Sequence, residues 1–163
     1  MNSQFVAYNG VEPTTAKRVA VATGTAIKTL QQVATPSTKG ITVLEWGISF
    51  DGSAAATPGS VELIETDVAA TSGTSVTPTK WGGNDNDVSL CVGGAGATNH
   101  SPSAEGTITA VRSFDAQLIS PTNQYVKQFP LGREPYIPPS KFLRVRVHFA
   151  ASINAISYII WEE

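Results

Sequence analysis

The sequence predicts an all-β fold: a single-domain antiparallel β-sandwich, jelly-roll-like, with an extended N-terminal arm. Short segments of alternating apolar and polar residues recur between clusters of Gly, Pro, Asn and Asp. No segment longer than a turn or two has the period of a helix. About eight to ten short strands in a chain of this length are typical of a sandwich or barrel, and the jelly roll is the arrangement that most often fits.

The clearest strand is Gly40–Phe50, GITVLEWGISF, which the following Asp-Gly pair ends as a turn. A two-residue period groups its large apolar side chains on one face. That face consists of Leu44, Trp46, Ile48 and Phe50. Ile41 and Val43 make the start of the other face apolar as well, so we expect a central strand that is covered on both sides at this end.

The segments before this strand are less regular. Residues 1–18 are polar and show no period, which predicts an arm over the surface or onto a neighbour, with Phe5 and Tyr8 as anchors. The β-sandwich domain is then expected at residues 19–163. Its first part, residues 19–33, fits two short strands better than a helix because threonine is frequent and helix caps are poor.

The segments after the central strand are predicted as further strands. Residues 61–68 are expected to return beside the central strand as the second half of a hairpin. Pro78 restricts residues 71–81 to a sheet edge or a bulge, and residues 88–92 are expected to form a short strand that holds Cys91. The remaining strands are predicted at residues 107–114, 117–119, 124–129, 142–149 and 153–161.

Composition narrows the classes of function. The net charge is −2 and only 15% of residues are charged, so there is no clustered positive charge of the kind that binds nucleic acid. No apolar run approaches the ~20 residues that span a membrane, and residues 1–10 do not have the pattern of a signal peptide. We therefore expect a soluble protein made in the cytoplasm, without nucleic acid or membrane as a partner. The one cysteine indicates no disulfide.

Candidate catalytic residues are few, and we predict that the protein is not an enzyme. A glycoside hydrolase needs two carboxylates about 5–10 Å apart. Glu45, Glu62 and Glu65 are the only candidate set in the sequence. Carboxylates on a solvated face, or pairing with Arg144 and Arg146, are the simpler interpretation.

No metal or other cofactor is predicted. Residues 84–87, Asn-Asp-Asn-Asp, alternate oxygen ligands as calcium loops do, but the spaced glycine and the distal glutamate of such loops are absent. A turn that uses its own side chains is the simpler interpretation. His100 and His148, with one cysteine between them, are too few for zinc, and the Gly-rich run at 93–96 has no helix after it to bind phosphate.

One predicted strand carries a basic stripe. Arg144, Arg146 and His148 alternate with the apolar residues of strand 142–149. A negatively charged fibre or capsid surface could bind such a stripe. Cross-strand pairing of the arginines with Glu or Asp is the alternative, and we favour it.

Two stretches and the end of the chain resemble a known group of proteins. The stretches are VLEWGISFDGSAAATPGSVEL at 43–63 and FPLGREPYIPPSKFLRVRV at 129–147, and the end is AISYIIWEE at 155–163. Together they resemble small β-sandwich structural proteins of tailed bacteriophages, some of which act as capsid decoration, or cement, proteins. The pattern includes no catalytic residues. Arg133 and Glu134 form a charged pair inside it, which we expect to bond the loop to a neighbouring strand or subunit.

The resemblance implies a non-enzymatic virion protein on the capsid surface. It implies a homotrimer at three-fold or quasi-three-fold positions of an icosahedral head, where it would clamp adjacent subunits of the major capsid protein and stabilise the shell by mass action. Low charge and neutral Ser/Thr faces agree with burial of sheet surface against other subunits. The residues expected at partner or subunit contacts are Phe5, Tyr8, Arg133, Glu134, Arg144, Arg146 and Trp161.

The alternative hypothesis is a carbohydrate- or receptor-binding β-sandwich module of a phage tail or fibre. In that case Trp81, the loop at residues 82–87 and Tyr125 would form a platform on which sugars stack. The position of the aromatic residues separates the two hypotheses. Exposed aromatic side chains clustered on loops would favour sugar binding, whereas aromatic side chains that are buried or at subunit contacts would favour decoration.

Overall fold

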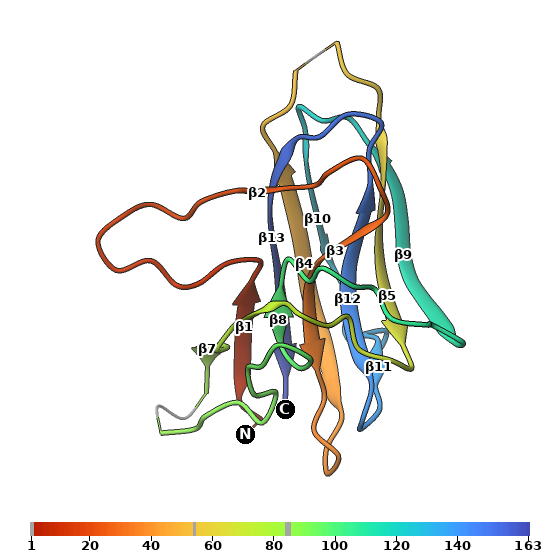
Figure 1. Ribbon diagram of the computed structural model, residues 1–163. Helices are drawn as coiled ribbons and strands as arrows, with labels where there is room; N and C mark the ends of the chain where they lie inside the picture. The colour runs from red at the N-terminus through yellow and green to blue at the C-terminus, as the bar shows by residue number, and fades with distance from the viewer. Residues whose placement is uncertain (1, 54, 84–85) are drawn as a thin grey trace.

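The computed structural model describes residues 2–53, 55–83 and 86–163, and all of its regular structure is β-strand. Two antiparallel sheets pack face to face around one core, so the predicted all-β sandwich is confirmed (Figure 1). The described residues contain no helix that could cross a membrane.

Sheet A has seven strands in the order β10-β4-β13-β1-β7, with β11 beside β4 and β2 beside β13. Its strands are β1 (Gln4–Tyr8), β2 (Val21–Ala22), β4 (Ile41–Phe50), β7 (Thr79–Gly82), β10 (Gln124–Gln128), β11 (Tyr136–Ile137) and β13 (Asn154–Glu162).

Sheet B has six strands in the order β6-β8-β3-β12-β5-β9. Its strands are β3 (Lys28–Ala34), β5 (Gly59–Thr66), β6 (Thr74–Ser75), β8 (Asn99–His100), β9 (Val111–Ile119) and β12 (Phe142–His148). The short strands β6 and β7, which flank Pro78, are edge strands, as the proline predicted.

The N-terminal arm is corrected by the structure. Residues Gln4–Tyr8 form β1, which lies inside sheet A between β13 and β7. Phe5 and Ala7 belong to the buried core. The sequence concealed this strand because it is only five residues long, its three middle residues are all apolar and buried rather than alternating, and a polar loop follows it directly.

Three other predicted elements differ from the structure. The central strand and residues 61–68 do not form a hairpin, because β4 belongs to sheet A and β5 to sheet B. Residues 88–92 lie outside the strands. The two strands expected at 107–114 and 117–119 are one strand, β9.

The central strand β4 contains a β-bulge that changes which side chains face the core. Ile160 of β13 lies opposite Glu45 and Trp161 opposite Val43, so Leu44 is an extra residue in β4. A bulge shifts the alternation by one. Val43, before the bulge, and Trp46, after it, therefore both point into the sandwich. The predicted grouping of Leu44 with Trp46, and of Val43 with the opposite face, is wrong for this reason.

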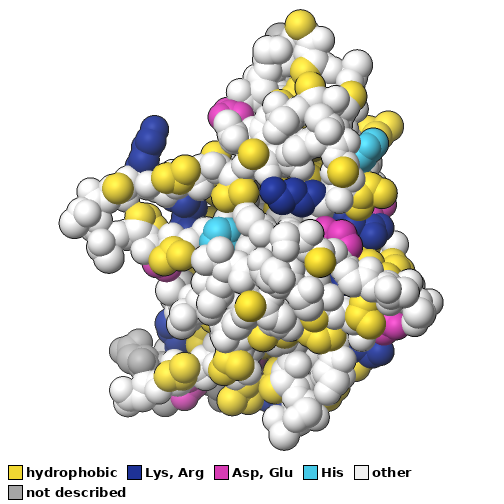
Figure 2. All heavy atoms as spheres, viewed as in Figure 1, with side chains coloured by type: hydrophobic (Ala, Val, Ile, Leu, Met, Phe, Trp, Pro, Cys, Tyr) yellow, Lys and Arg dark blue, Asp and Glu magenta, His cyan; other side chains and the backbone are white. Residues whose placement is uncertain are grey.

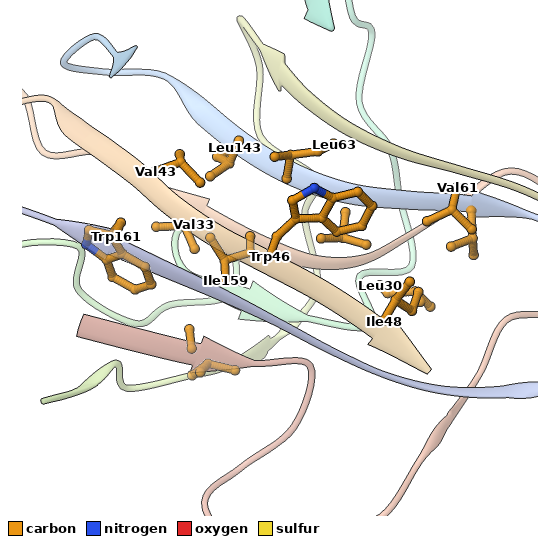
Figure 3. Close-up of a cluster of buried hydrophobic side chains, with 14 of the residues drawn as sticks. Leu30, Val33, Val43, Trp46, Ile48, Val61, Leu63, Leu143, Ile159 and Trp161 are labelled. Atoms are coloured by element: carbon orange, nitrogen blue, oxygen red, sulfur yellow. The ribbon is translucent and has the colours of Figure 1, made fainter. Parts of the chain in front are cut away.

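The core is built from the inner faces of both sheets. Trp46 and Trp161 have no exposed side-chain surface and lie among aliphatic side chains (Figure 3). The core residues labelled there come from β3, β4, β5, β12 and β13, and the predicted inward residues of β12, Leu143 and Val145, are among the most buried. Replacing a buried tryptophan by alanine in such a core typically costs about 3–5 kcal/mol.

The outer face of sheet B is tied to the irregular segments that precede β6 and β9. Arg144 of β12 is completely buried. Its guanidinium donates to the carbonyl oxygen of Glu105 at 3.0 Å, to the Glu105 carboxylate at 3.1 Å and to the carbonyl oxygen of Val68. Gln32 of β3 adds bonds to the Ala70 amide at 2.7 Å and to the Ala97 carbonyl at 2.6 Å. One charged and one neutral side chain thus stabilise an otherwise irregular region.

At two places in sheet A, a loop separates two consecutive strands that pair with the same neighbouring strand. β1 and β2 both run antiparallel to β13, and residues 9–20 leave the sheet between them; we call these residues the 9–20 loop. On the other side of the central pair, β10 and β11 both run antiparallel to β4, and residues 129–135 leave between them; we call these the 129–135 loop. The central strands β4 and β13 therefore have one loop on each flank (Figure 1).

Substitution of Arg144 tests the anchoring of the irregular segments. Arg144→Ala removes the ion-pair partner of the Glu105 carboxylate, which keeps its bonds from Thr29, and leaves the carbonyl groups of Glu105 and Val68 without this donor. We therefore expect a loss of about 3–5 kcal/mol in the free energy of unfolding. Arg146→Ala is the matched control, since Arg146 is a partly exposed residue of the same strand that pairs with Glu62. It should cost less than about 1 kcal/mol. Urea denaturation measures both, and equal losses would contradict the assignment.

Candidate functional site

Several of the residues predicted at partner or subunit contacts lie in the interior. Phe5 and Trp161 are both core residues, with ring centroids 6.3 Å apart. Neither has side-chain surface left for another subunit. The sequence showed that β13 is apolar on both faces, but not that β1 and β4 cover it on both edges.

The predicted basic stripe is occupied by internal contacts. Arg146 donates two hydrogen bonds of 2.8 and 2.9 Å to Glu62, which lies directly opposite it on β5. Arg144 is buried against Glu105. Cross-strand pairing with a carboxylate, the favoured interpretation, therefore holds for Arg146, whereas the carboxylate partner of Arg144 lies in a segment outside the strands. His148 is exposed at the end of β12.

The candidate catalytic carboxylates do not converge. Glu45 of sheet A accepts a hydrogen bond of 2.5 Å from the Tyr158 hydroxyl. Glu62 and Glu65 belong to β5 in sheet B and, being three residues apart in a strand, point to opposite faces. Each has its own arginine partner, Arg146 and Arg112 respectively.

The residues expected to form a sugar platform are separated. Tyr125 is on β10 and Trp81 on β7, at opposite ends of the strand order of sheet A. The Tyr125 ring packs against Trp46 in the core, with centroids 5.5 Å apart, and its hydroxyl donates to Asp115 at 2.8 Å. Burial and the Asp115 bond raise the pKa of Tyr125 to about 12. Trp81 is exposed.

The oxygen-rich run at 84–87 falls partly outside the described residues, since 84 and 85 are not among them. Asp87 is engaged by the Ser3 hydroxyl and by Lys80. Among the described residues no three His, Cys, Asp or Glu side chains are grouped closely enough to hold a metal ion.

An exposed apolar row lies on the segment between β7 and β8. Val88, Leu90 and Val92 are 79%, 48% and 64% exposed, whereas the residues between them, Ser89 and Cys91, are buried. The usual distribution is therefore reversed, because the small and polar side chains point inward. We call Val88, Leu90 and Val92 the apolar row. The sequence showed the alternation but not its direction, since either face could have been the buried one.

The carboxylate of Glu163 holds the apolar row in place. It accepts hydrogen bonds from the Ser89 hydroxyl at 2.5 Å, the Leu90 amide at 2.8 Å and the Trp161 indole at 2.9 Å. Burial alone would raise the pKa of Glu163, but these hydrogen bonds outweigh it and the net effect is a lowered pKa. Burial also raises the pKa of the Cys91 thiol, so that thiol is not a reactive nucleophile. The row is thus a fixed feature of the surface.

A tyrosine pair occupies the outer face of sheet A at the base of the 9–20 loop. The rings of Tyr8 and Tyr158 lie 5.7 Å apart, and the Arg18 guanidinium lies 3.9 Å from the Tyr8 ring centroid. Gly47, opposite Tyr158, leaves room for that ring, because a Cβ there would come within 2.5 Å of it. Burial and then the bond to Glu45 raise the pKa of Tyr158. Predicted contact residue Tyr8 therefore supports the loop.

A hollow of about 570 Å³ lies on the same sheet beside the 129–135 loop. Thr42 of β4, Glu162 of β13 and Gln4 of β1 form one row across the sheet and line part of it. The rest of the lining is Leu44, Gln128, Phe129, Pro130, Leu131 and Glu134. Arg133 is exposed, and neither its side chain nor that of Glu134 bonds another described residue, so the expected bond from this charged pair to a neighbouring strand is not made within the described part of the chain.

Comparison of the chain with protein-family models, with curated proteins and with solved structures gave no match. Function is therefore inferred from these surfaces themselves.

The lowered pKa of Glu163 predicts a pH dependence of stability. Because the folded-state pKa lies below the ordinary value of 4.5, the stabilisation is fully present above pH 4.5 and is lost as pH falls through the folded-state value. We expect the difference in unfolding free energy between the natural protein and Glu163→Gln to be constant from pH 7 to 5 and to shrink below pH 4.5. Urea denaturation between pH 7 and 3 measures it.

Leu118→Ser is the control for this series, since Leu118 is 78% exposed on β9 and its substitution changes no ionisable group. Its difference from the natural protein should not vary over the same range. A Glu163→Gln difference that stays flat down to pH 3 would contradict the role given to the carboxylate.

Proposed function

We propose that this protein is a non-enzymatic virion component that decorates and stabilises a bacteriophage capsid as a homotrimer, bridging subunits of the major capsid protein. The apolar row is the observation that carries the proposal. Three aliphatic side chains held outward by a buried carboxylate form a fixed, uncharged ridge, which suits the surface of another protein better than a small polar ligand.

The location of the apolar row supports one-sided attachment. The row belongs to the end of the sandwich where the two chain termini lie (Figure 1). Hydrophobic side chains are exposed at this end in the space-filling view, as they are elsewhere on the face shown (Figure 2), and Lys39 and Asp87 line a pocket together with Val88 and Leu90. A ridge at one end lets the protein stand on a shell while the sheets remain free for contacts between copies. In this arrangement the apolar row faces the major capsid protein.

The strand order supports the finer fold assignment, a jelly roll. Strands β1-β13-β4-β10 are neighbours in sheet A and β3-β12-β5-β9 in sheet B. The last strand thus lies between the first and the third of these eight, and the chain passes repeatedly from one sheet to the other. Jelly rolls occur in viral capsid proteins and in lectins, so the fold agrees with decoration but does not select it.

Sugar binding, the second hypothesis, has less support. It required Tyr125 beside Trp81, and the Tyr125 ring instead packs on Trp46 in the core. Trp81 alone gives one exposed aromatic face, whereas a stacking platform needs several groups that converge on the ligand.

Binding to capsid shells tests the proposal. The double variant Val88→Ser/Val92→Ser removes most of the apolar surface of the row without touching the Glu163 bonds. We expect its affinity for empty shells of the phage that encodes it to fall about tenfold or more, because buried aliphatic side chains contribute roughly 1.5–3 kcal/mol each. Co-sedimentation with purified shells, quantified against protein concentration, measures the change.

Leu118→Ser is the matched control, since Leu118 is 78% exposed on β9, away from the row. It should bind shells as the natural protein does. If the natural protein fails to sediment with shells at any concentration, the decoration proposal is wrong, and a glycan array becomes the next experiment. If both variants bind equally well, a different face meets the shell.

A further inference from the structure

We propose that the 9–20 loop of one copy docks into the hollow beside the 129–135 loop of the next, with Lys17 against Glu134, and that this head-to-tail contact closes the ring. The inference rests on the proposed homotrimer and assigns its interface.

The hollow is acidic and apolar. Glu134 and Glu162 supply two negative charges, and the lining residues include no Lys or Arg. Leu44, Phe129, Pro130 and Leu131 give the same hollow an aliphatic and aromatic wall, and Leu131 is almost fully exposed. The chemistry that fits is a lysine or arginine side chain flanked by apolar residues.

Of the two carboxylates in the hollow, Glu134 is the one without a hydrogen-bond or ion-pair partner among the described residues. Each of the other eleven described Asp and Glu side chains has a hydrogen-bond or ion-pair partner, Glu162 included, which accepts from the Asn2 amide at 2.5 Å. Glu134 has none among the described residues and is half-buried. A partly desolvated carboxylate without a partner is unfavourable alone and gains most from an incoming cation.

The 9–20 loop carries a matching group. Residues 11–17 are all exposed, and the loop projects sideways from the body (Figures 1 and 2). Arg18 is occupied by Glu12 at 2.7 Å and by the Tyr8 ring, which leaves Lys17 as the cation of the loop without a described partner. Val11 and Val19 are largely exposed beside it. The loop thus presents the charge and the apolar groups that the hollow lacks.

The topology makes the contact heterologous. The loop leaves sheet A after Tyr8, at one end of β1, and projects sideways from the body (Figure 1), whereas Gln4 and Glu162 line the hollow at the other end of β1. Among the described residues that line the hollow, none belongs to the loop of the same copy. Contact between two different surfaces on successive copies generates a ring when the rotation closes, which a three-fold does.

A charge-reversal cycle tests this interface. Lys17→Glu and Glu134→Lys should each weaken self-association about tenfold or more, because each places like charges in contact. The double variant Lys17→Glu/Glu134→Lys restores opposite charges and should associate within about threefold of the natural protein. Light scattering over a hundredfold range of concentration measures the mass, with a trimer expected at about 51 kDa, three times the 17.1 kDa chain. Lys39→Glu, at an exposed lysine outside the loop and the hollow, is the control for net charge in light scattering only, because Lys39 lines a pocket with Val88 and Leu90 of the apolar row.

The outcomes separate the interface from the function. A natural trimer that both single reversals leave intact, or that the double variant fails to restore, overturns the interface and leaves decoration standing. A natural protein that stays monomeric throughout also overturns it. Reversals that reduce binding to purified shells while the trimer persists would assign the hollow to the major capsid protein instead. Loss of shell binding by the natural protein would overturn decoration alone.

Discussion

The pairing of β4 with β13 is the constraint on which the rest of the structure depends. These two strands share eight register positions at the centre of sheet A. The bulge at Leu44 brings Val43 and Trp46 onto one face, opposite the facing strands of sheet B, and so determines the core. The same pair bears β1 and β2 on one flank and β10 and β11 on the other. Both loops that leave sheet A therefore take their positions from this single ladder.

Most strands could be predicted from the sequence, because alternation reports a half-buried strand directly. β4, β12 and β13 were located almost to their boundaries. Alternation does not reveal a bulge inside a strand. Because of the bulge at Leu44, Val43 faces the core together with Trp46, and the faces predicted for Val43 and Leu44 are wrong. Alternation also could not report what covers an outer face. Arg144 points outward, as its place in the pattern predicted, and is buried because residues 67–110 include irregular segments that cross it.

The candidate surfaces were less predictable than the fold, since they depend on contacts between distant residues. The apolar row faces solvent because Glu163, more than seventy positions along the chain, holds Ser89 and the Leu90 amide inward. Nothing local in the run Val88–Val92 distinguishes that orientation from its opposite. In the same way, Phe5 and Trp161 appeared suitable for subunit contacts as large apolar groups near the chain ends, and they are instead packed together in the core.

The construction of the 9–20 loop shows how a projecting segment can bind without a large loss of entropy. Asn9 takes the place of strand residues opposite β13: its amide donates to the Ser157 carbonyl, and its side chain bonds the Ala155 carbonyl and the Ser157 amide. The two ends of the loop are thereby held in one strand line, and Arg18 braces the base through Glu12 and Tyr8. Ordering a free arm of this length on binding would cost about 1–2 kcal/mol per residue. Because the ends and the base are already fixed, the freedom that binding removes is mainly that of the exposed residues 13–17, so more of the contact energy remains as affinity.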